Sequence, residues 1–291
     1  MLGAAAGIAA LKQLQLRDCV LLDGDEGLAA AMSQLPAGLE HLGISQVTSS
    51  RYLQGYACFP TGVLQWLQQL TYLELACIQL QRPDEASPTL QPLQALARLV
   101  DLQLHADIMW SVTASMLLET QKLTRLSVRS CSVEPGVLAG KTQLQHLEER
   151  ECYWSCAGPP CATAHLLSRL QDLQALTHLS LRGSVPVDRT IPAAAFSVLT
   201  ASSKLHHLDI SCNMLPAAVW QHVLPAEKQL PHLQELSCLD IELFSGGSAP
   251  PLESTRLISC CPGLQSLDIG NTGHSAGGLQ DVAELLGALR G

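Results

Sequence analysis

Apolar residues recur at fixed positions along most of the chain. The segment from Leu205 to Leu215 reads LHHLDISCNML, with apolar side chains at its first, fourth, sixth and eleventh positions and Asn213 at its ninth. The alternation of apolar and polar residues in LHHLDIS predicts a strand with one buried face. The asparagine after the strand can turn inward and bond backbone groups that a tight bend leaves unpaired.

This pattern returns about ten times, at intervals of 21 to 32 residues. The first positions of the ten copies are Leu11, Leu39, Leu70, Leu99, Leu123, Leu144, Leu176, Leu205, Leu233 and Leu264. One copy cannot bury its apolar face alone, so neighbouring copies must stack. We therefore expect positions 1, 4 and 6 of each copy to point into a core and positions 3, 5 and 7 to line the opposite face of a sheet. The leucines predicted to share one continuous core include Leu73, Leu75, Leu102, Leu104, Leu126, Leu179, Leu181, Leu208 and Leu267.

Helix-compatible segments lie between the predicted strands. They have apolar residues at helical spacing and cover Ala162–Leu176, Ile191–Leu199, Pro216–Leu224 and Ala276–Leu289. An interval near 28 residues leaves room for a strand, a turn and a helix, and we expect extended or 3₁₀ segments in the shorter intervals.

The pattern L-x-x-L-x-L-x-x-N-x-L resembles that of the leucine-rich repeat family over essentially the whole chain. Its spacing, and the cysteines that replace the asparagine, are similar to a mixture of the ribonuclease-inhibitor-like and cysteine-containing subclasses. The segment SCCPGLQSLDIG is similar to repeats of F-box receptors, although no F-box-like region precedes the first copy. The resemblance implies an α/β solenoid shaped like a horseshoe, with parallel strands on the concave face and helices on the convex face.

This resemblance also bears on domain organisation. We expect residues 1–291 to form a single repeat domain. Neither end shows a polar capping repeat, which such proteins need for solubility, so we expect the chain to be a fragment of a longer protein or the product of an incomplete gene model.

Amino-acid composition and net charge limit the functions and the cellular location that we expect for this chain. The net charge of −9 disfavours a nucleic-acid or anionic-membrane binder. The eleven cysteines lie mostly inside or just after predicted strands, and no secretory signal or membrane-spanning run is readable, so we expect reduced thiols in a cytoplasmic monomer without a cofactor.

Basic side chains gather on one part of the predicted concave face. They occupy position 7 (Arg129, Arg150, Arg182) and position 3 (Arg125, His146, His178, His207) of the fifth to eighth copies. Like charges stacked at strand spacing repel, which favours an anionic partner, and arginine forks suit carboxylates or phosphates. The alternative interpretation is a solvated face whose arginines are offset by Glu148, Glu151 and Asp209.

Two metal hypotheses compete with this interpretation, and we favour neither. The histidines at position 3 could form a ladder, but zinc requires a tetrahedron of ligands. Cys152, Cys156, Cys161 and His165 have ligand types that could hold zinc, yet their spacing matches no known zinc module, and Cys152 takes the usually buried asparagine position.

Glu149 occupies position 6, where an apolar residue belongs. A lone buried carboxylate is costly. We expect an irregular strand that lets Glu149 reach solvent; the alternative is an arginine partner.

No nucleophile elbow, Walker loop, dinucleotide-binding glycine motif or H-E-x-x-H motif is present, so an enzyme is not predicted. The sequence favours a protein-interaction scaffold that binds an acidic or phosphorylated segment of another protein on the concave sheet. Alternatives are the substrate-recognition part of a ubiquitin ligase complex and a structural component of the cytoskeleton or the ciliary axoneme.

Overall fold

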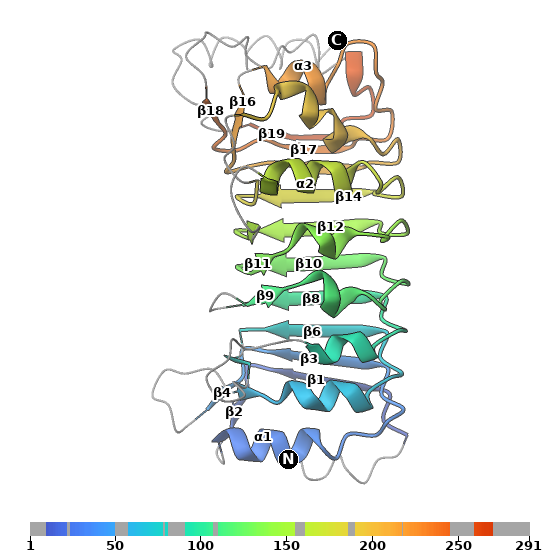
Figure 1. Cartoon of the computed structure of the whole chain (residues 1–291), viewed down its shortest axis with the longest axis vertical. Coiled ribbons are helices and arrows are strands. Elements are labelled where there is room, and N and C mark those ends of the chain that lie inside the picture. Colours follow the sequence, from blue (N-terminus) through green and yellow to red (C-terminus); the bar gives the residue numbers. More distant parts are fainter. Residues whose placement is uncertain are drawn as a thin grey trace. The chain divides into compact units, whose positions relative to one another are not determined.

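The computed structural model of the chain describes residues 10–21, 24–49, 58–77, 79–80, 91–106, 110–154, 161–185, 190–216, 218–244 and 259–269. The chain divides into two compact units, residues 1–141 and 142–291. Each unit is built on parallel strands that follow one another in chain order (Figure 1).

Five strands form the sheet of the first unit, in the order β1-β3-β6-β8-β10. They are β1 (Gln13–Arg17), β3 (His41–Ser45), β6 (Tyr72–Ala76), β8 (Asp101–His105) and β10 (Arg125–Arg129). Each strand covers positions 3 to 7 of its copy, and equivalent positions pair across the sheet, as Leu73 does with Leu102. The predicted strands and their register are therefore confirmed in this unit.

Five more strands form the sheet of the second unit, in the order β12-β14-β15-β17-β19. They are β12 (His146–Arg150), β14 (His178–Arg182), β15 (His207–Asp209), β17 (Glu235–Ser237) and β19 (Ser266–Asp268). The last three strands are shorter and cover positions 3 to 5, but equivalent positions again pair, as Leu208 does with Leu236.

The apolar positions of these strands build the core. Of the nine leucines predicted to be buried, eight are at most 1% exposed. Leu267 is only half-buried, so the prediction is wrong for this residue. It lies in β19, the last described strand, which pairs only with β17. Leu14 and Leu16 in β1 are half-buried for the same reason, since β1 pairs only with β3.

Most connecting helices are short, and several are 3₁₀ rather than α. The α-helices are α1 (Gly24–Met32), α2 (Cys161–Leu170) and α3 (Val219–Val223), and the 3₁₀ helices are η2 (Thr61–Trp66), η3 (Gln91–Ala95), η4 (Ala114–Leu117), η5 (Pro135–Leu138) and η6 (Ala193–Thr200). Within the part of the chain that the structure describes, no helix is long and apolar enough to cross a membrane.

The expected helices are only partly confirmed. The segment 162–176 contains α2, which ends at Leu170, and the segment 216–224 contains only the five residues of α3. The segment 191–199 forms the 3₁₀ helix η6 instead of an α-helix. A 3₁₀ helix rises about 2.0 Å per residue and therefore spans a repeat with fewer residues than an α-helix needs. The segment 276–289 lies outside the described residues.

Short strands follow most of the long ones and extend the parallel pairing. They are β2 (Val20–Leu21), β4 (Thr48–Ser49), β5 (Cys58–Phe59), β7 (Gln79–Leu80), β9 (Ser111–Val112), β11 (Ser132–Val133), β13 (Tyr153–Trp154), β16 (Met214–Pro216) and β18 (Glu242–Phe244). The pairs β2–β4, β5–β7, β9–β11 and β16–β18 are all parallel.

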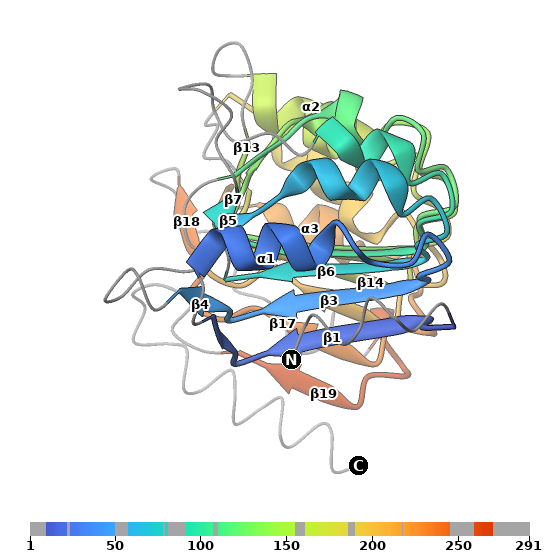
Figure 2. The ribbon, with the colours of Figure 1, turned by 90° about the horizontal axis from the view of Figure 1, so that it is seen from below.

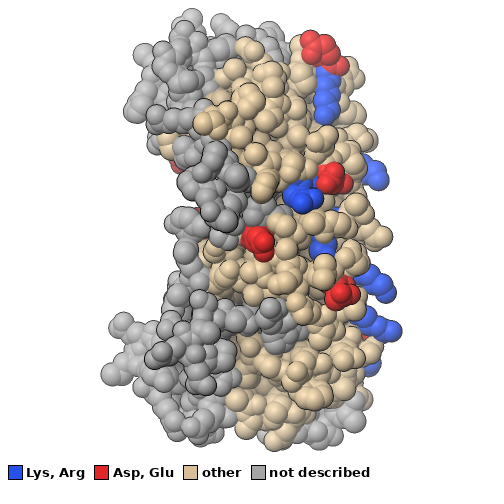
Figure 3. Space-filling view, in the orientation of Figure 1, with Lys and Arg blue, Asp and Glu red and all other residues tan. Residues whose placement is uncertain are grey.

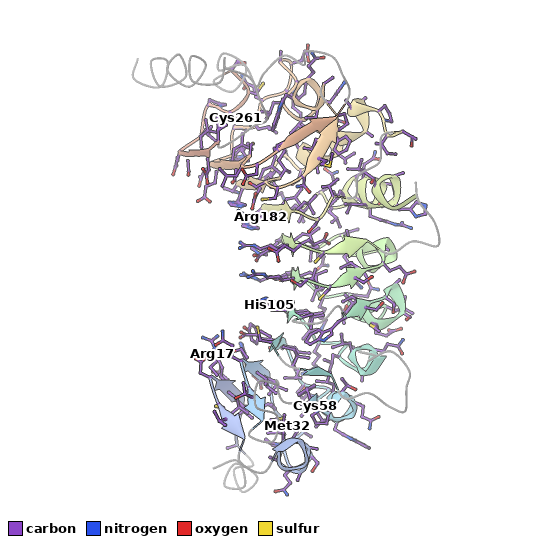
Figure 4. All side chains as sticks on the ribbon, turned by 90° about the vertical axis from the view of Figure 1, so that its left-hand side faces the viewer. Arg17, Met32, Cys58, His105, Arg182 and Cys261 are labelled. Atoms are coloured by element: carbon purple, nitrogen blue, oxygen red, sulfur yellow. The ribbon has the colours of Figure 1, made fainter. Side chains whose placement is uncertain are left out.

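Among the described residues, the helices lie on one side of the strands, and none of these helices covers the other side. In the first unit, α1 lies along β1 and β3 on a single side (Figure 2), and the fully buried Met32 lies between α1 and the strands (Figure 4). The view toward the helices shows few charged side chains among the described residues, and most of them lie near one edge (Figure 3). We call the opposite side, formed by positions 3, 5 and 7, the strand face.

A bend at position 8 follows almost every repeat strand. The residue at this position has a positive φ in eight copies: Asp18, Gln46, Cys77, Ser130, Glu151, Gly183, Cys212 and Asp240. Only one of the eight is glycine, although a positive φ is uncommon for other residues. The backbone N–H at position 8 hydrogen-bonds to the next repeat strand, as when the Glu151 N–H donates to the Arg182 carbonyl at 2.9 Å.

Asn213 holds the bend that follows β15. Its Nδ2 donates to the carbonyls of Leu181, Ile210 and Ser211 at 2.7, 2.8 and 3.1 Å, and its Oδ1 accepts from the Val185 N–H at 2.9 Å. The prediction that this asparagine turns inward is confirmed.

Candidate functional site

Three imidazoles stack on the strand face of the second unit. His146, His178 and His207 occupy position 3 of β12, β14 and β15, and their backbones pair in register. The ring centroids of each neighbouring pair lie 3.9 Å apart, with interplanar angles of 11° and 6°. The strand spacing of about 4.8 Å brings the rings this close because equivalent positions align across a parallel sheet. We call these three residues the histidine column.

A carboxylate lies at each end of the histidine column. Glu148 Oε2 is 3.5 Å from His146 Nε2, and Glu235 Oε2 is 2.8 Å from His207 Nδ1. Both pairs become ion pairs when the imidazole is protonated. Stacked planar rings direct their nitrogens outward at their edges, and this arrangement does not converge on the tetrahedral centre that zinc requires.

Two arginines lie beside the histidine column at position 7. Arg150 and Arg182 pair in register on β12 and β14. Arg150 Nε is 2.6 Å from Glu148 Oε1, so Glu148 contacts both Arg150 and His146. Figure 4 shows Arg182 on the side of the strands away from the helices, and none of its described neighbours forms an ion pair with its guanidinium.

The other two predicted residues lie on the last strand of the first unit. Arg125 Nε is 3.9 Å from Asp101 Oδ2, and Arg129 pairs in register with His105 and is exposed. All seven predicted residues therefore lie on the strand face, five in the second unit and two in the first.

Carboxylates balance part of this basic charge. Glu148 pairs with Arg150, as the interpretation of a solvated face supposed, and Asp101 lies near Arg125. Asp209 is 7% exposed and is bonded instead by the Ser180 hydroxyl at 3.1 Å and the Ser211 N–H at 3.0 Å. Arg129 and Arg182 are thus the arginines with most freedom to meet a partner, and the binding role of all seven residues stays a prediction.

A polar cluster on the strand face of the first unit escaped the sequence interpretation. Glu74 accepts hydrogen bonds from Tyr72 at 2.9 Å and Arg17 at 3.3 Å, and the Gln15 side-chain oxygen accepts from Arg17 Nε at 3.0 Å. The contacts span β3 because Gly43 has no side chain there, and an added Cβ would lie 3.2 Å from the Gln15 side chain and 3.3 Å from Glu74. A glycine at position 5 between two long polar residues was the signal available in the sequence.

The cysteines follow the repeat rather than a ligand arrangement. Cys152 is buried, and its thiol donates to the Arg150 carbonyl at 3.5 Å, as Cys131 does to Arg129 at 3.2 Å. Cys156 lies outside the described residues, and the described ones contain no cluster of ligands that could hold a metal. The described cysteines that form no disulfide are Cys19, Cys58, Cys77, Cys131, Cys152, Cys212, Cys238, Cys260 and Cys261.

The structure contradicts both expectations for Glu149, namely an irregular strand that lets it reach solvent and an arginine partner. The strand β12 is regular, Glu149 pairs in register with Leu181, and its side chain is fully buried. Among the described residues neither carboxylate oxygen has a hydrogen-bond partner. Burial raises the pKa of Glu149 well above its usual range, because an apolar environment disfavours the charged form.

Comparison with known proteins finds similar solved structures but no similar sequence. No protein-family model and no curated protein matches the sequence. The structure is similar to a leucine-rich repeat protein of Leptospira interrogans over 92% of this chain, with 16% identity and a TM-score of 0.53. The alignment covers 62% of that protein's chain, so the present chain spans less than two thirds of it.

Two further solved structures align with this chain. TLR13, in a TLR13–ssRNA13 complex, aligns over 97% of this chain and 36% of its own, with 15% identity and a TM-score of 0.51. An internalin (InlF) from Listeria monocytogenes aligns over 92% of this chain and 88% of its own, with 15% identity and a TM-score of 0.39.

Proposed function

Because the chain has the leucine-rich repeat fold, an α/β solenoid of parallel strands, we propose that it is a non-enzymatic scaffold that binds another protein on its strand face. The observation that carries the proposal is the histidine column beside Arg150 and Arg182 in the second unit. Five side chains that can carry positive charge lie on three adjacent strands of a chain whose net charge is −9.

The partner that suits this group is anionic. Arg182 has a guanidinium fork without an ion pair among its described neighbours, and such forks bind carboxylates and phosphates with two parallel hydrogen bonds. Arg129 on the first unit is exposed, whereas Arg182 is half-buried. An acidic or phosphorylated segment of a protein therefore fits better than a basic one.

Other functions predict different outcomes. TLR13 is found with a single-stranded RNA, and RNA is the other polyanion to test here, although the acidic composition of this chain favours a protein. The ubiquitin-ligase and cytoskeletal alternatives concern the identity of the partner. A broad activity screen tests the alternative that the chain is an enzyme.

Affinity capture from cell lysate, followed by mass spectrometry, tests the proposal. Replacing Arg129, Arg150 and Arg182 together by Glu should abolish capture of the partner that wild type retains. The matched control reverses three exposed basic residues elsewhere, Lys122, Arg169 and Lys204, and should leave capture unchanged. Equal capture by wild type and the strand-face variant would show that the partner binds elsewhere, and nuclease-sensitive capture would indicate RNA.

A further inference from the structure

On the strand face of the second unit, the arginines and the exposed carboxylates lie at opposite ends of the sheet, whereas the mostly buried Glu148 on β12 pairs with Arg150. Arg150 and Arg182 lie on the first two strands, β12 and β14. Glu235 and Asp268 lie on the last two described strands, β17 and β19. We call the first pair the basic end and the second pair the acidic end.

Both ends are accessible to a partner. The side chains of Arg150 and Glu235 are 45% and 59% exposed, and Asp268 is exposed as well. The Glu235 carboxylate keeps an accessible surface even though it also accepts from His207.

The strand between the two ends presents little net charge. Asp209 on β15 is nearly buried and is bonded by Ser180 and by the Ser211 N–H. The Ser211 hydroxyl in turn lies 2.9 Å from the Ser237 hydroxyl. This hydrogen-bonded strip separates the basic and acidic ends and gives the face a direction.

The distance between the ends follows from the register. Glu235 pairs with His207, which pairs with His178, so Glu235 lies two strands and four positions from Arg182. Asp268 lies three strands and two positions from Arg182. With strands about 4.8 Å apart and a rise of about 3.3 Å per residue, both separations are roughly 16 Å, which about five residues of extended chain would span.

We infer that this face binds a bipolar segment, with acidic side chains over the basic end and Lys or Arg about five residues away over the acidic end. The inference rests on the proposed function and specifies its partner. Electrostatic complementarity fixes the direction and register of such a segment. Glu235 and Asp268 would repel a uniformly acidic ligand, and Arg150 and Arg182 a uniformly basic one, so each end also excludes wrong partners.

The experiment is selection of a phage-displayed library of random twelve-residue peptides on the immobilised full chain. Peptides with an acidic pair and a basic pair about three to six residues apart should be enriched at least about tenfold over the unselected library. The double variant R150Q/R182Q should remove the preference for acidic residues and keep that for basic ones. The double variant E235Q/D268N should do the reverse.

The second variant separates this inference from the proposed function. A site that only recognises anions gains affinity when Glu235 and Asp268 are neutralised, whereas a bipolar site loses it. A selected bipolar peptide, labelled with a fluorophore, should bind E235Q/D268N at least about tenfold more weakly than wild type in fluorescence anisotropy. The matched control, K204Q/E227Q, neutralises one exposed residue of each sign and should bind as wild type does.

Three outcomes would overturn the inference. One is enrichment of uniformly acidic peptides whose binding is unchanged or tighter in E235Q/D268N, which leaves the proposed function standing. Another is enrichment without any charge pattern. The third is the absence of enriched peptides, in which case lysate capture with the arginine variant still decides the proposed function by itself.

Discussion

Replacing Glu149 by Gln should stabilise the protein increasingly as the pH rises. Burial raises the pKa of Glu149 in the folded chain, so its carboxyl keeps the proton to a higher pH than in the unfolded chain, where it ionises near the ordinary glutamate pKa of 4.5. Above that pH the unfolded state has released a proton that the folded state retains. The free energy of unfolding therefore falls as pH rises, by about 1.4 kcal/mol per pH unit, until the pH reaches the pKa of the folded state.

The magnitude can be isolated with E149Q, since the amide has nearly the same size and does not ionise. Between pH 5 and pH 7 the stability advantage of E149Q over wild type should grow, by about 1.4 kcal/mol for each pH unit below the folded-state pKa of Glu149. E149L should be more stable still, by about 1–3 kcal/mol, because it also removes polar atoms that have no partner among the described residues. Urea denaturation followed by circular dichroism, repeated across this pH range, measures both differences.

Glu148 provides the matched control on the same strand. Its carboxylate faces the other side of the sheet and contacts Arg150 and His146. E148Q should therefore lower stability, by up to about 1 kcal/mol, and should show no advantage that grows with pH. A constant difference between E149Q and wild type from pH 5 to pH 7 would refute the reasoning, because it would mean that Glu149 ionises in the folded protein.

Four further predictions concern the core, a bend, the thiols and the strand face. L208A removes a fully buried side chain and should lower the free energy of unfolding by about 2–5 kcal/mol in urea denaturation, whereas a loss below about 1 kcal/mol would mean that the core is loosely packed. N213A removes the hydrogen bonds that Asn213 makes to four backbone groups and should lower the free energy of unfolding by about 2–4 kcal/mol. An unchanged free energy of unfolding would contradict the role assigned to this asparagine. In the native protein Cys212 should be alkylated before the buried Cys131 and Cys238. After denaturation without reductant, mass spectrometry should find all eleven cysteines alkylated, and pairs of unlabelled cysteines would indicate disulfides. Capture of an acidic partner should weaken as salt rises from about 0.05 to 0.5 M, because salt screens the strand-face arginines, and capture that is insensitive to salt would place the partner elsewhere.

The strands of this fold could be predicted residue by residue. Alternation with a period of two is a local signal, and a shift by one residue would expose every leucine of a strand. The seven long strands from β1 to β14 accordingly cover positions 3 to 7 as the pattern predicted. The composition of the strand face follows from the same register.

The connecting helices were harder to predict because their sequences are short. Apolar residues spaced three and four apart suit both an α-helix and a 3₁₀ helix, and segments such as Ala193–Thr200 span about two turns of either. Whether an α-helix or a 3₁₀ helix forms depends on how many residues lie between the neighbouring strands. In the interval that begins at Leu39, residues 60–69 lie between β5 and Leu70, and six of these ten residues form η2.

Side-chain partners depend on both local and distant sequence. The contacts of Glu148 could be anticipated, because residues two apart on a strand face the same side. The burial of Glu149 could not, since packing across many strands keeps β12 in register despite one unfavourable side chain. The cluster around Glu74 depends on Gly43, which lies one repeat away in sequence from Gln15 and Arg17, and only the folded sheet brings these residues together.

The bends at position 8 have a consequence for how such a protein can change over time. The requirement there applies to the backbone and not to the side chain, because Asp, Gln, Cys, Ser, Glu and Gly all adopt a positive φ at this position. Most of these side chains are exposed and stand directly beside the strand face. Within each unit, the bends thus form a border where mutations alter charge and size at small cost to folding. Natural variation can adjust partner preference along this border while the leucines beneath it stay fixed.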